Sequence, residues 1–192
     1  MRIIGGSAGG RRLVAPAKGT RPTSDRVREA LFSSLDAMCG GWHDLRVLDL
    51  YAGSGALGLE ALSRGAREVL LVDHDRDARR SIEANIEAVG LPGARISSAS
   101  VREVLGRPSE ATFDLAFLDP PYAVPVDEIR DVLRCMATGG WLAEDAIVVV
   151  ERDAREQDAP WPDDDWEAVR RRAYGDTALW YGRFLGNSSG ES

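Results

Sequence analysis

The chain has 192 residues, a net charge of −7 and 44% hydrophobic residues. These values are typical of one globular domain with a sizeable core, and no apolar run approaches the roughly 20 residues that cross a membrane. No signal peptide is evident, and Cys39 and Cys135 form no metal-binding or disulfide pattern. We therefore expect a cytoplasmic monomer that holds no metal and meets no membrane.

The charge is distributed unevenly along the chain. Residues 1–28 contain seven Arg or Lys side chains and one acid, a net charge of +6, so the remainder carries −13. This asymmetry indicates a local patch for an anionic partner on an acidic body, although a solvated, flexible arm has the same composition. The residues expected to contact this partner are Arg11, Arg12, Arg21, Thr23, Arg26 and Arg28.

The first 40 residues are expected to form a short basic extension. Residues 2–4 and 12–14 are predicted as two short strands around a glycine-rich turn, either a hairpin or a loose arm. A helix then begins near Ser24 or Asp25, which are both good N-caps, and ends at Gly40.

Residues 41–186 are predicted as the main domain, in which apolar strands alternate with helices. This alternation indicates an α/β fold with a parallel sheet covered by helices on both faces. The strands are expected at 46–51, 68–73, 94–98, 113–119 and 146–151, and the helices at 56–64, 75–89, 101–106 and 126–137.

The end of the chain changes character. Residues 152–165 are rich in acids and are predicted as a loop. Residues 166–173 and 178–184 flank a Tyr-Gly-Asp-Thr turn and are predicted as an antiparallel hairpin that ends the parallel sheet and brings it to seven strands. Residues 187–192 are expected to be disordered.

A glycine-rich loop follows the first strand of the main domain. Gly53, Gly55 and Gly58 form G-x-G-x-x-G between strand and helix, which lets the backbone approach a ligand and offers helix N–H groups to it. The next strand ends in Asp73, about 20 residues on, where an acid binds ribose hydroxyls. The pattern predicts a nucleotide-containing cofactor, and a side chain placed at Gly55 is expected to enter its pocket.

A second motif, Asp119-Pro120-Pro121-Tyr122, ends a later apolar strand at the same edge of the sheet. The exocyclic amine of a base is a poor nucleophile because its lone pair conjugates with the ring. Acceptors on both N–H groups, from the Asp119 carboxylate and the Pro120 carbonyl, would free that lone pair, and Tyr122 could stack on the base. A strand-ending turn is the plainer alternative. Together with the glycine loop, the motif indicates an S-adenosylmethionine-dependent amino-methyltransferase.

Several cofactor contacts have a second interpretation. Asp73 could cap the following helix, a role for which Asp75 competes. Asp49 either positions the amine of the cofactor's methionine or caps the glycine turn, and Ser100 either contacts adenine or caps a helix. The predicted cofactor-binding set is Asp49, Tyr51, Gly53, Ser54, Gly55, Asp73, Ser100 and Val101.

Five stretches of the chain resemble the RsmD family, namely residues 2–6, 21–23, 28–32, 49–58 and 119–122. The resemblance implies a Rossmann-like class I methyltransferase that uses S-adenosylmethionine to methylate the N2 amine of one guanine in 16S rRNA. The substrate it implies is the 30S subunit or its assembly intermediate. Gly53, Ser54 and Gly55 would hold the cofactor, and residues 119–122 would be catalytic. The chain departs from the family at Ser100, where an acid or amide is usual, and in the acidic loop at 152–165, which is expected to face away from RNA.

Three rival functions share part of this pattern. A DNA adenine-N6 or cytosine-N4 amino-methyltransferase uses the same D-P-P-Y but normally carries a target-recognition domain, for which 192 residues leave no room. A nucleotide-dependent oxidoreductase explains the glycines and Asp73 and leaves D-P-P-Y without a role. A non-catalytic RNA chaperone would use the basic extension and be indifferent to Asp119.

Overall fold

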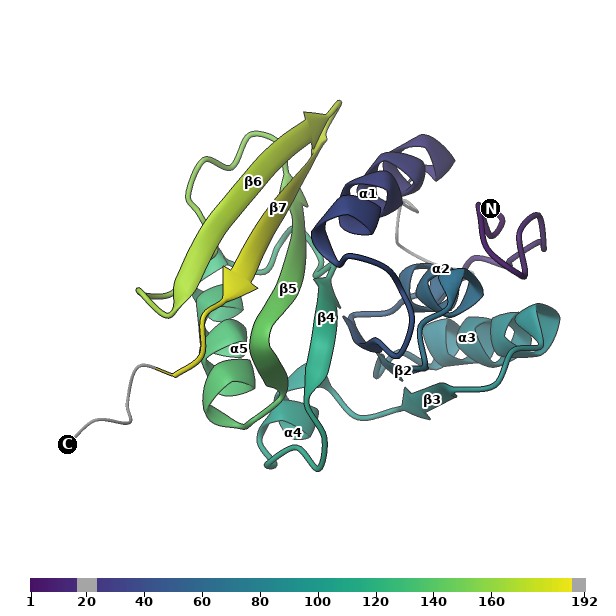
Figure 1. Ribbon diagram of the computed structural model, residues 1–192, viewed down its shortest axis with the longest axis horizontal. Helices are drawn as coiled ribbons and strands as arrows, with labels where there is room; N and C mark the ends of the chain where they lie inside the picture. Colours follow the sequence, from purple (N-terminus) through teal and green to yellow (C-terminus); the bar gives the residue numbers. More distant parts are fainter. Residues whose placement is uncertain (17–23, 188–192) are drawn as a thin grey trace.

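The computed structural model describes residues 1–16 and 24–187. One seven-stranded sheet has the order β3-β2-β1-β4-β5-β7-β6, in which β1 to β5 are parallel and β7 runs antiparallel to both neighbours (Figure 1). This confirms the predicted fold class and the terminal hairpin. The strands are β1 (Arg46–Leu50), β2 (Glu68–Val72), β3 (Ala94–Ser97), β4 (Phe113–Leu118), β5 (Leu142–Asp153), β6 (Trp166–Tyr174) and β7 (Thr177–Phe184).

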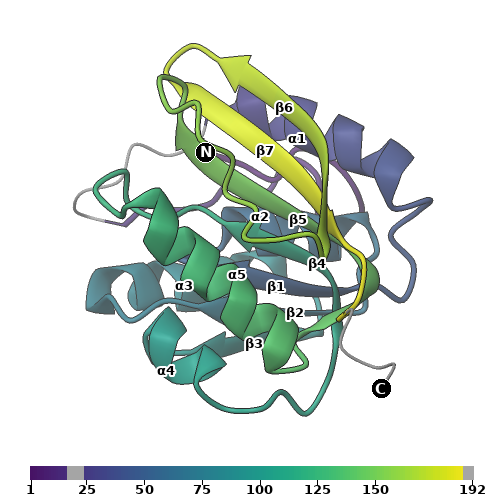
Figure 2. The same ribbon diagram turned by 90° about the vertical axis from the view of Figure 1, so that its left-hand side faces the viewer.

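Helices cover both faces of the sheet (Figures 1 and 2). One face packs against α1 (Asp25–Met38), α2 (Ala56–Arg64) and α3 (Arg76–Val89). The other packs against α4 (Val101–Leu105) and α5 (Val126–Thr138). We call these the α1 face and the α5 face. Parallel strands buried on both faces account for the near-continuous apolar sequences of β1 and β4.

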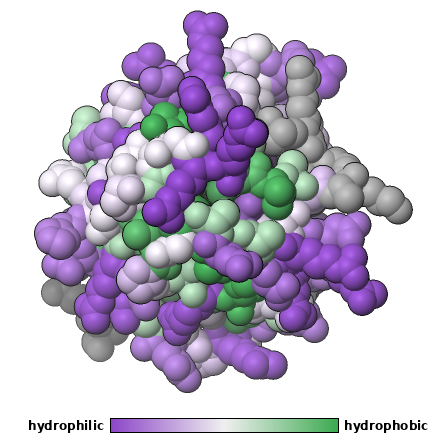
Figure 3. Space-filling view, turned by 90° about the vertical axis from the view of Figure 1, so that its right-hand side faces the viewer, coloured by the Kyte–Doolittle hydropathy of each residue, from purple (hydrophilic) through white to green (hydrophobic). Residues whose placement is uncertain are grey.

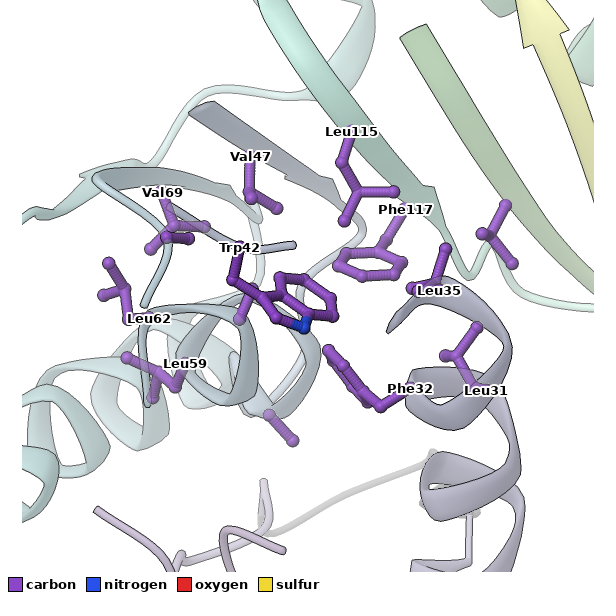
Figure 4. Close-up of a cluster of buried hydrophobic side chains, with 14 of the residues drawn as sticks. Leu31, Phe32, Leu35, Trp42, Val47, Leu59, Leu62, Val69, Leu115 and Phe117 are labelled. Carbon is purple, nitrogen blue, oxygen red and sulfur yellow. The ribbon is translucent and has the colours of Figure 1, made fainter. Parts of the chain in front are cut away.

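Aromatic packing fixes α1 against the sheet (Figure 4). The ring of Phe32 lies 5.4 Å from that of Trp42 and 5.9 Å from that of Phe117 on β4. Leu31 and Leu35, on the same side of the helix, are also buried. The helix begins at the predicted place because the Ser24 hydroxyl accepts the N–H of Val27.

The strand β5 is longer than its apolar core predicts. It was expected over 146–151 and extends from Leu142 to Asp153. At its beginning Leu142 pairs with Phe113 across a register shift, and at its end Asp153 pairs with Thr177 of the hairpin. These partners lie far away in sequence, so the extra residues carry no local signal.

The N-terminal segment is a docked turn. Arg2 and Arg12 form an antiparallel bridge, and Ile3, Ala8 and Leu13 are buried in the core of the α1 face. This is the hairpin alternative of the sequence analysis. Residues 1–13 and α1 therefore share one core with the sheet, and the division of the chain at residue 40 stays a prediction.

Glu60 on α2 holds this segment in place. Its carboxylate is fully buried and accepts the N–H groups of Ile4 and Gly5 at 2.6 and 2.9 Å. Arg64 donates to the same carboxylate at 2.9 Å. Charge-assisted bonds of this kind are stronger than neutral ones, so Glu60 is the main polar anchor of the turn.

Viewed from the side of α3 and the N-terminal segment, the surface shows apolar side chains gathered near its centre among hydrophilic ones (Figure 3). Among the described residues no helix is long and apolar enough to span a membrane, and no group of acids, histidines or cysteines could hold a metal ion. The predictions for Arg21, Thr23 and the tail beyond Asn187 fall outside the described residues. Asn187 itself donates to the carbonyl of Ala137 at 3.3 Å.

Candidate active site

A cavity of about 240 Å³ opens at the carboxyl ends of β1, β2 and β4. Parallel sheets bind ligands at this edge. The cavity brings together the glycine loop, Asp73 and the D-P-P-Y motif, which are separated by up to about 70 residues of sequence. The predicted residues that line it are Tyr51, Gly53, Asp73, Val101, Asp119 and Pro121, and they are joined there by Pro16, Val72, His74, Asp75 and Ala78.

Gly53 and Gly55 both adopt left-handed backbone conformations, with φ of 58° and 74°. A Cβ on Gly53 would meet nothing closer than the Tyr51 carbonyl oxygen at 3.9 Å, so this residue presents an open backbone to the cavity. A Cβ on Gly55 would instead contact Ile82 and Leu71 of the core at 3.5 Å. The expectation that a side chain at Gly55 enters the cofactor pocket is therefore wrong, and Gly53 is the position that faces the cavity.

Gly58 allows α2 to approach the sheet. A Cβ there would lie 2.5 Å from Val69 Cγ2, closer than side chains tolerate. The N–H of Gly58 donates to Asp49 Oδ2 at 2.9 Å, so a strand carboxylate caps the first turn of the helix. This is the capping role considered for Asp49. Asp49 is 1% exposed and does not line the cavity, so its contact with the cofactor's amine stays a prediction.

The environment of Asp49 disfavours its charged form. Burial raises its pKa from 3.8 to about 7, the bond from Gly58 lowers it, and the nearby charge of Asp73 raises it. The carboxyl of Asp49 therefore titrates near neutrality.

Asp73 and Asp75 have separate roles. Asp75 caps α3 by accepting the N–H groups of Asp77 and Ala78. Asp73 Oδ2 accepts the N–H of Gly53 at 2.8 Å, which ties it to the glycine loop at the cavity wall. The capping alternative for Asp73 thus belongs to Asp75, and its contact with ribose stays a prediction.

Ser100 is the N-cap of α4 and forms a capping box with Glu103. Its side chain is absent from the cavity wall, whereas the next residue, Val101, lies in that wall. The capping role is observed, and an adenine contact by Ser100 stays a prediction.

Asp119 has a buried acidic neighbour that the sequence analysis missed. The register of β4 and β5 pairs Leu118 with Val150, so Asp119 and Glu151 follow side by side. Glu151 is 6% exposed. Burial, then Glu151, then Asp49 raise the pKa of Asp119 well above its usual value. The sequence does hold a signal for Glu151, because this acid directly follows an apolar run, residues 146–150, as Asp73 and Asp119 follow theirs.

The D-P-P-Y motif and the residues after it are held by contacts from β5 and β7. The Tyr122 hydroxyl lies 3.2 Å from Thr177 Oγ1 at the start of β7, and its side chain is 47% exposed. Arg152, which is 2% exposed, donates to the Val124 carbonyl at 2.6 Å and forms two 2.8 Å bonds with Glu156. These supports have no local sequence signal.

The acidic loop between β5 and β6 packs on the α5 face through Ala154, Ala159 and Trp161. Near its start, Glu156 and Asp158 share a cavity of about 210 Å³ with Tyr122. That this loop faces away from RNA stays a prediction.

The predicted basic contacts divide into three groups. Arg12 and Arg26 are exposed. Arg11 is exposed but donates to the carbonyls of Ala88 and Val89, where it caps the end of α3. Arg28 is 1% exposed and bonds to Asp25 and to the Arg2 carbonyl. A phosphate cannot reach that guanidinium, so the contact predicted for Arg28 is corrected.

A larger cavity of about 440 Å³ lies under α4 on the α5 face. It is lined by Arg46, Glu68 and Arg95 among others and contains none of the predicted site residues. Cavity size therefore does not locate the site, and the convergence of motifs does.

The strand order, the terminal hairpin and the site at the carboxyl edge together define a class I methyltransferase. A family described as "Conserved hypothetical protein 95" matches residues 1–183. The chain belongs to this family, which is the RsmD family.

Its relatives include enzymes with assigned names. It is 34% identical to "Ribosomal RNA small subunit methyltransferase D" of Escherichia coli, over 100% of this chain and 93% of that protein. It is 36% identical to "Putative rRNA methyltransferase YlbH" of Bacillus subtilis, over 93% and 96%. A solved structure, "Putative methyltransferase yhhF from Escherichia coli", superposes with a TM-score of 0.82 at 33% identity, over 97% of this chain and 99% of that one.

Proposed function

We propose that this protein transfers a methyl group from S-adenosylmethionine to the exocyclic N2 amine of one guanine in 16S rRNA. The observation that carries the proposal is the single cavity shared by Gly53, Asp73, Asp119 and Pro121. The names of the relatives favour ribosomal RNA over the DNA alternative. We place the reaction in the cytoplasm, on the 30S subunit or its assembly intermediate, with the protein acting as a monomer.

The residues present fit this cofactor. The open backbone of Gly53 leaves room for a ligand against the loop, and the Asp73 carboxylate beside it suits the two ribose hydroxyls. Tyr51 and Val101 supply apolar wall. When bound there, S-adenosylmethionine would supply an electrophilic methyl group, whose bond to sulfur would break as the amine attacks, with S-adenosylhomocysteine as the leaving group.

The chain's own groups act on the base. The Asp119 carboxylate and the Pro120 carbonyl accept the two N–H groups of the amine, which frees its lone pair for in-line attack. Tyr122 stacks on the base. As the new C–N bond forms, the amine releases one proton, and Asp119 takes it. Burial beside Glu151 makes Asp119 a stronger base than an ordinary carboxylate.

The test is transfer of tritiated methyl to 30S particles that lack the modification, followed by identification of the product nucleoside. We expect N2-methylguanosine. Methylated adenine or cytosine as the product, or no transfer to the particles, would overturn this proposal.

The role of Asp119 is tested separately. Asp119→Ala should lower transfer by at least about a hundredfold while cofactor binding persists, since the proposed role acts on the amine. Asp131→Asn, which changes an exposed carboxylate on α5, is the control. An Asp119→Ala enzyme within a few-fold of wild type would disprove the mechanism.

A further inference from the structure

The edge strand β6 carries three consecutive arginines, Arg170, Arg171 and Arg172. The register with β7 places Arg170 opposite Tyr181 and Arg172 opposite Leu179, both buried in the core of the α1 face. Directly opposed residues of an antiparallel pair project from the same face. Arg170 and Arg172 therefore lie on the α1 face, at the outer edge of the sheet (Figure 1).

Arg171 projects to the other face and has partners there. Its guanidinium lies 5.0 Å from the centre of the Trp180 ring and donates to the carbonyls of Ala154 and Glu156. It is thus a structural residue that links the hairpin to the acidic loop.

Arg170 and Arg172 are exposed, and neither makes an ion pair with a described residue. Some exposed arginines have acidic partners, as in the pairs Arg79–Glu83 and Arg134–Asp131. Others, such as Arg12 and Arg76, are exposed without an ion pair to a described residue, but Arg170 and Arg172 are two such cations on one face of one strand. On a chain with a net charge of −7, two neighbouring uncompensated cations form a local positive stripe.

The stripe is connected to the D-P-P-Y motif through the turn of the hairpin. Thr177, which contacts the Tyr122 hydroxyl, lies opposite Tyr174 in the hairpin register. From Tyr174 the same face continues to Arg172 and Arg170 in steps of two residues, roughly 6.6 Å each. Phe117, two residues before Asp119, packs on this same face. The arginines thus lead away from the site on the side of the sheet that carries Asp119.

We propose that Arg170 and Arg172 bind successive phosphates of the RNA strand next to the target guanine. This inference rests on the proposed function and extends it by assigning the path of the RNA. The step between the two side chains is comparable to the distance between successive phosphates in a single strand. The opposite face carries the acidic loop, which repels phosphate, so the strand follows the α1 face.

The test compares two charge reversals of equal size. The first combines Arg170→Glu with Arg172→Glu, and the control combines Arg95→Glu on β3 with Arg134→Glu on α5, both exposed and away from the stripe. For each protein, binding of a labelled single-stranded RNA containing guanine is titrated across a salt series. Methyl transfer to 30S particles is measured in parallel.

We expect the first variant to raise the Kd for RNA and the KM for particles at least about tenfold. The slope of log affinity against log salt should decrease by about 1.4, because two single-strand phosphate contacts are lost. Cofactor affinity and the melting temperature should match wild type. Arg170→Gln with Arg172→Gln should give the same change in slope with a smaller loss of affinity, because it removes attraction without adding repulsion.

An unchanged slope, or a change equal to that of the control, would overturn this inference while leaving the proposed function intact. If the wild-type protein methylated no rRNA, the proposed function would fail. The RNA titration would still decide whether these two arginines bind phosphate.

Discussion

Asp49 links the stability of the protein to pH. Its carboxyl is 1% exposed, and its pKa rises from 3.8 to about 7 on folding. Because the native state holds this proton more tightly than the unfolded state, stability falls by about 1.4 kcal/mol per pH unit between these two values. The full penalty is about 4 kcal/mol above pH 7 and vanishes below the unfolded pKa.

Asp49→Asn should remove this penalty. The amide oxygen of asparagine can still accept the N–H of Gly58, so the cap on α2 is kept. The advantage of the variant over wild type should therefore grow by roughly 3 kcal/mol between pH 5 and pH 8. For a chain of this size, that difference corresponds to about 6 to 12 °C in melting temperature.

The measurement is urea unfolding of both proteins at half-unit steps from pH 4.5 to pH 8.5. A difference in unfolding free energy that does not change with pH would refute the reasoning, since it would mean that Asp49 titrates alike in both states. Cofactor titration of the same variant resolves the second role of Asp49. Unchanged affinity for S-adenosylmethionine would leave only the cap, and a loss that appears as wild-type Asp49 ionises would establish contact with the amine.

Three further predictions concern the supports of the site. Gly58→Ala should cost about 1–3 kcal/mol through its clash with Val69 and leave cofactor affinity unchanged. Gly53→Ala should cost about 1–2 kcal/mol because its backbone is left-handed, and it should also weaken cofactor binding, which calorimetry measures. Glu60→Ala should cost about 3 kcal/mol and open residues 1–13 to trypsin, while Glu83→Ala on the surface should do neither. Arg152→Lys should lower kcat about tenfold with cofactor affinity unchanged, because the charge-assisted bonds that hold the catalytic loop are weakened. The control is Arg130→Lys, because Arg130 also bonds the acidic loop, at the carbonyl of Ala159. Equal kinetic losses in the two variants would contradict a specific role for Arg152.

Local sequence patterns predicted most of the fold and the main part of the candidate site. The alternation of apolar strands and helices, the N-caps at Ser24 and Ser100 and the hairpin turn all depend on residues close together in the chain. The glycine loop, Asp73 and D-P-P-Y were recognised because each follows a strand of a parallel sheet. Such strands end at one edge, so motifs far apart in sequence were expected to meet there.

Only the tertiary structure decided what surrounds these motifs. Arg28 looked like a phosphate ligand in a basic stretch, but the docked N-terminal turn buries its guanidinium. Glu151 lies beside Asp119 because β4 and β5 are neighbours, and Arg152 holds the catalytic loop from the end of β5. Burial, charge neighbours and long-range hydrogen bonds depend on which distant segments fold together. A short stretch of sequence does not contain that information. It does contain the residue preferences that form a strand, a helix cap or a turn.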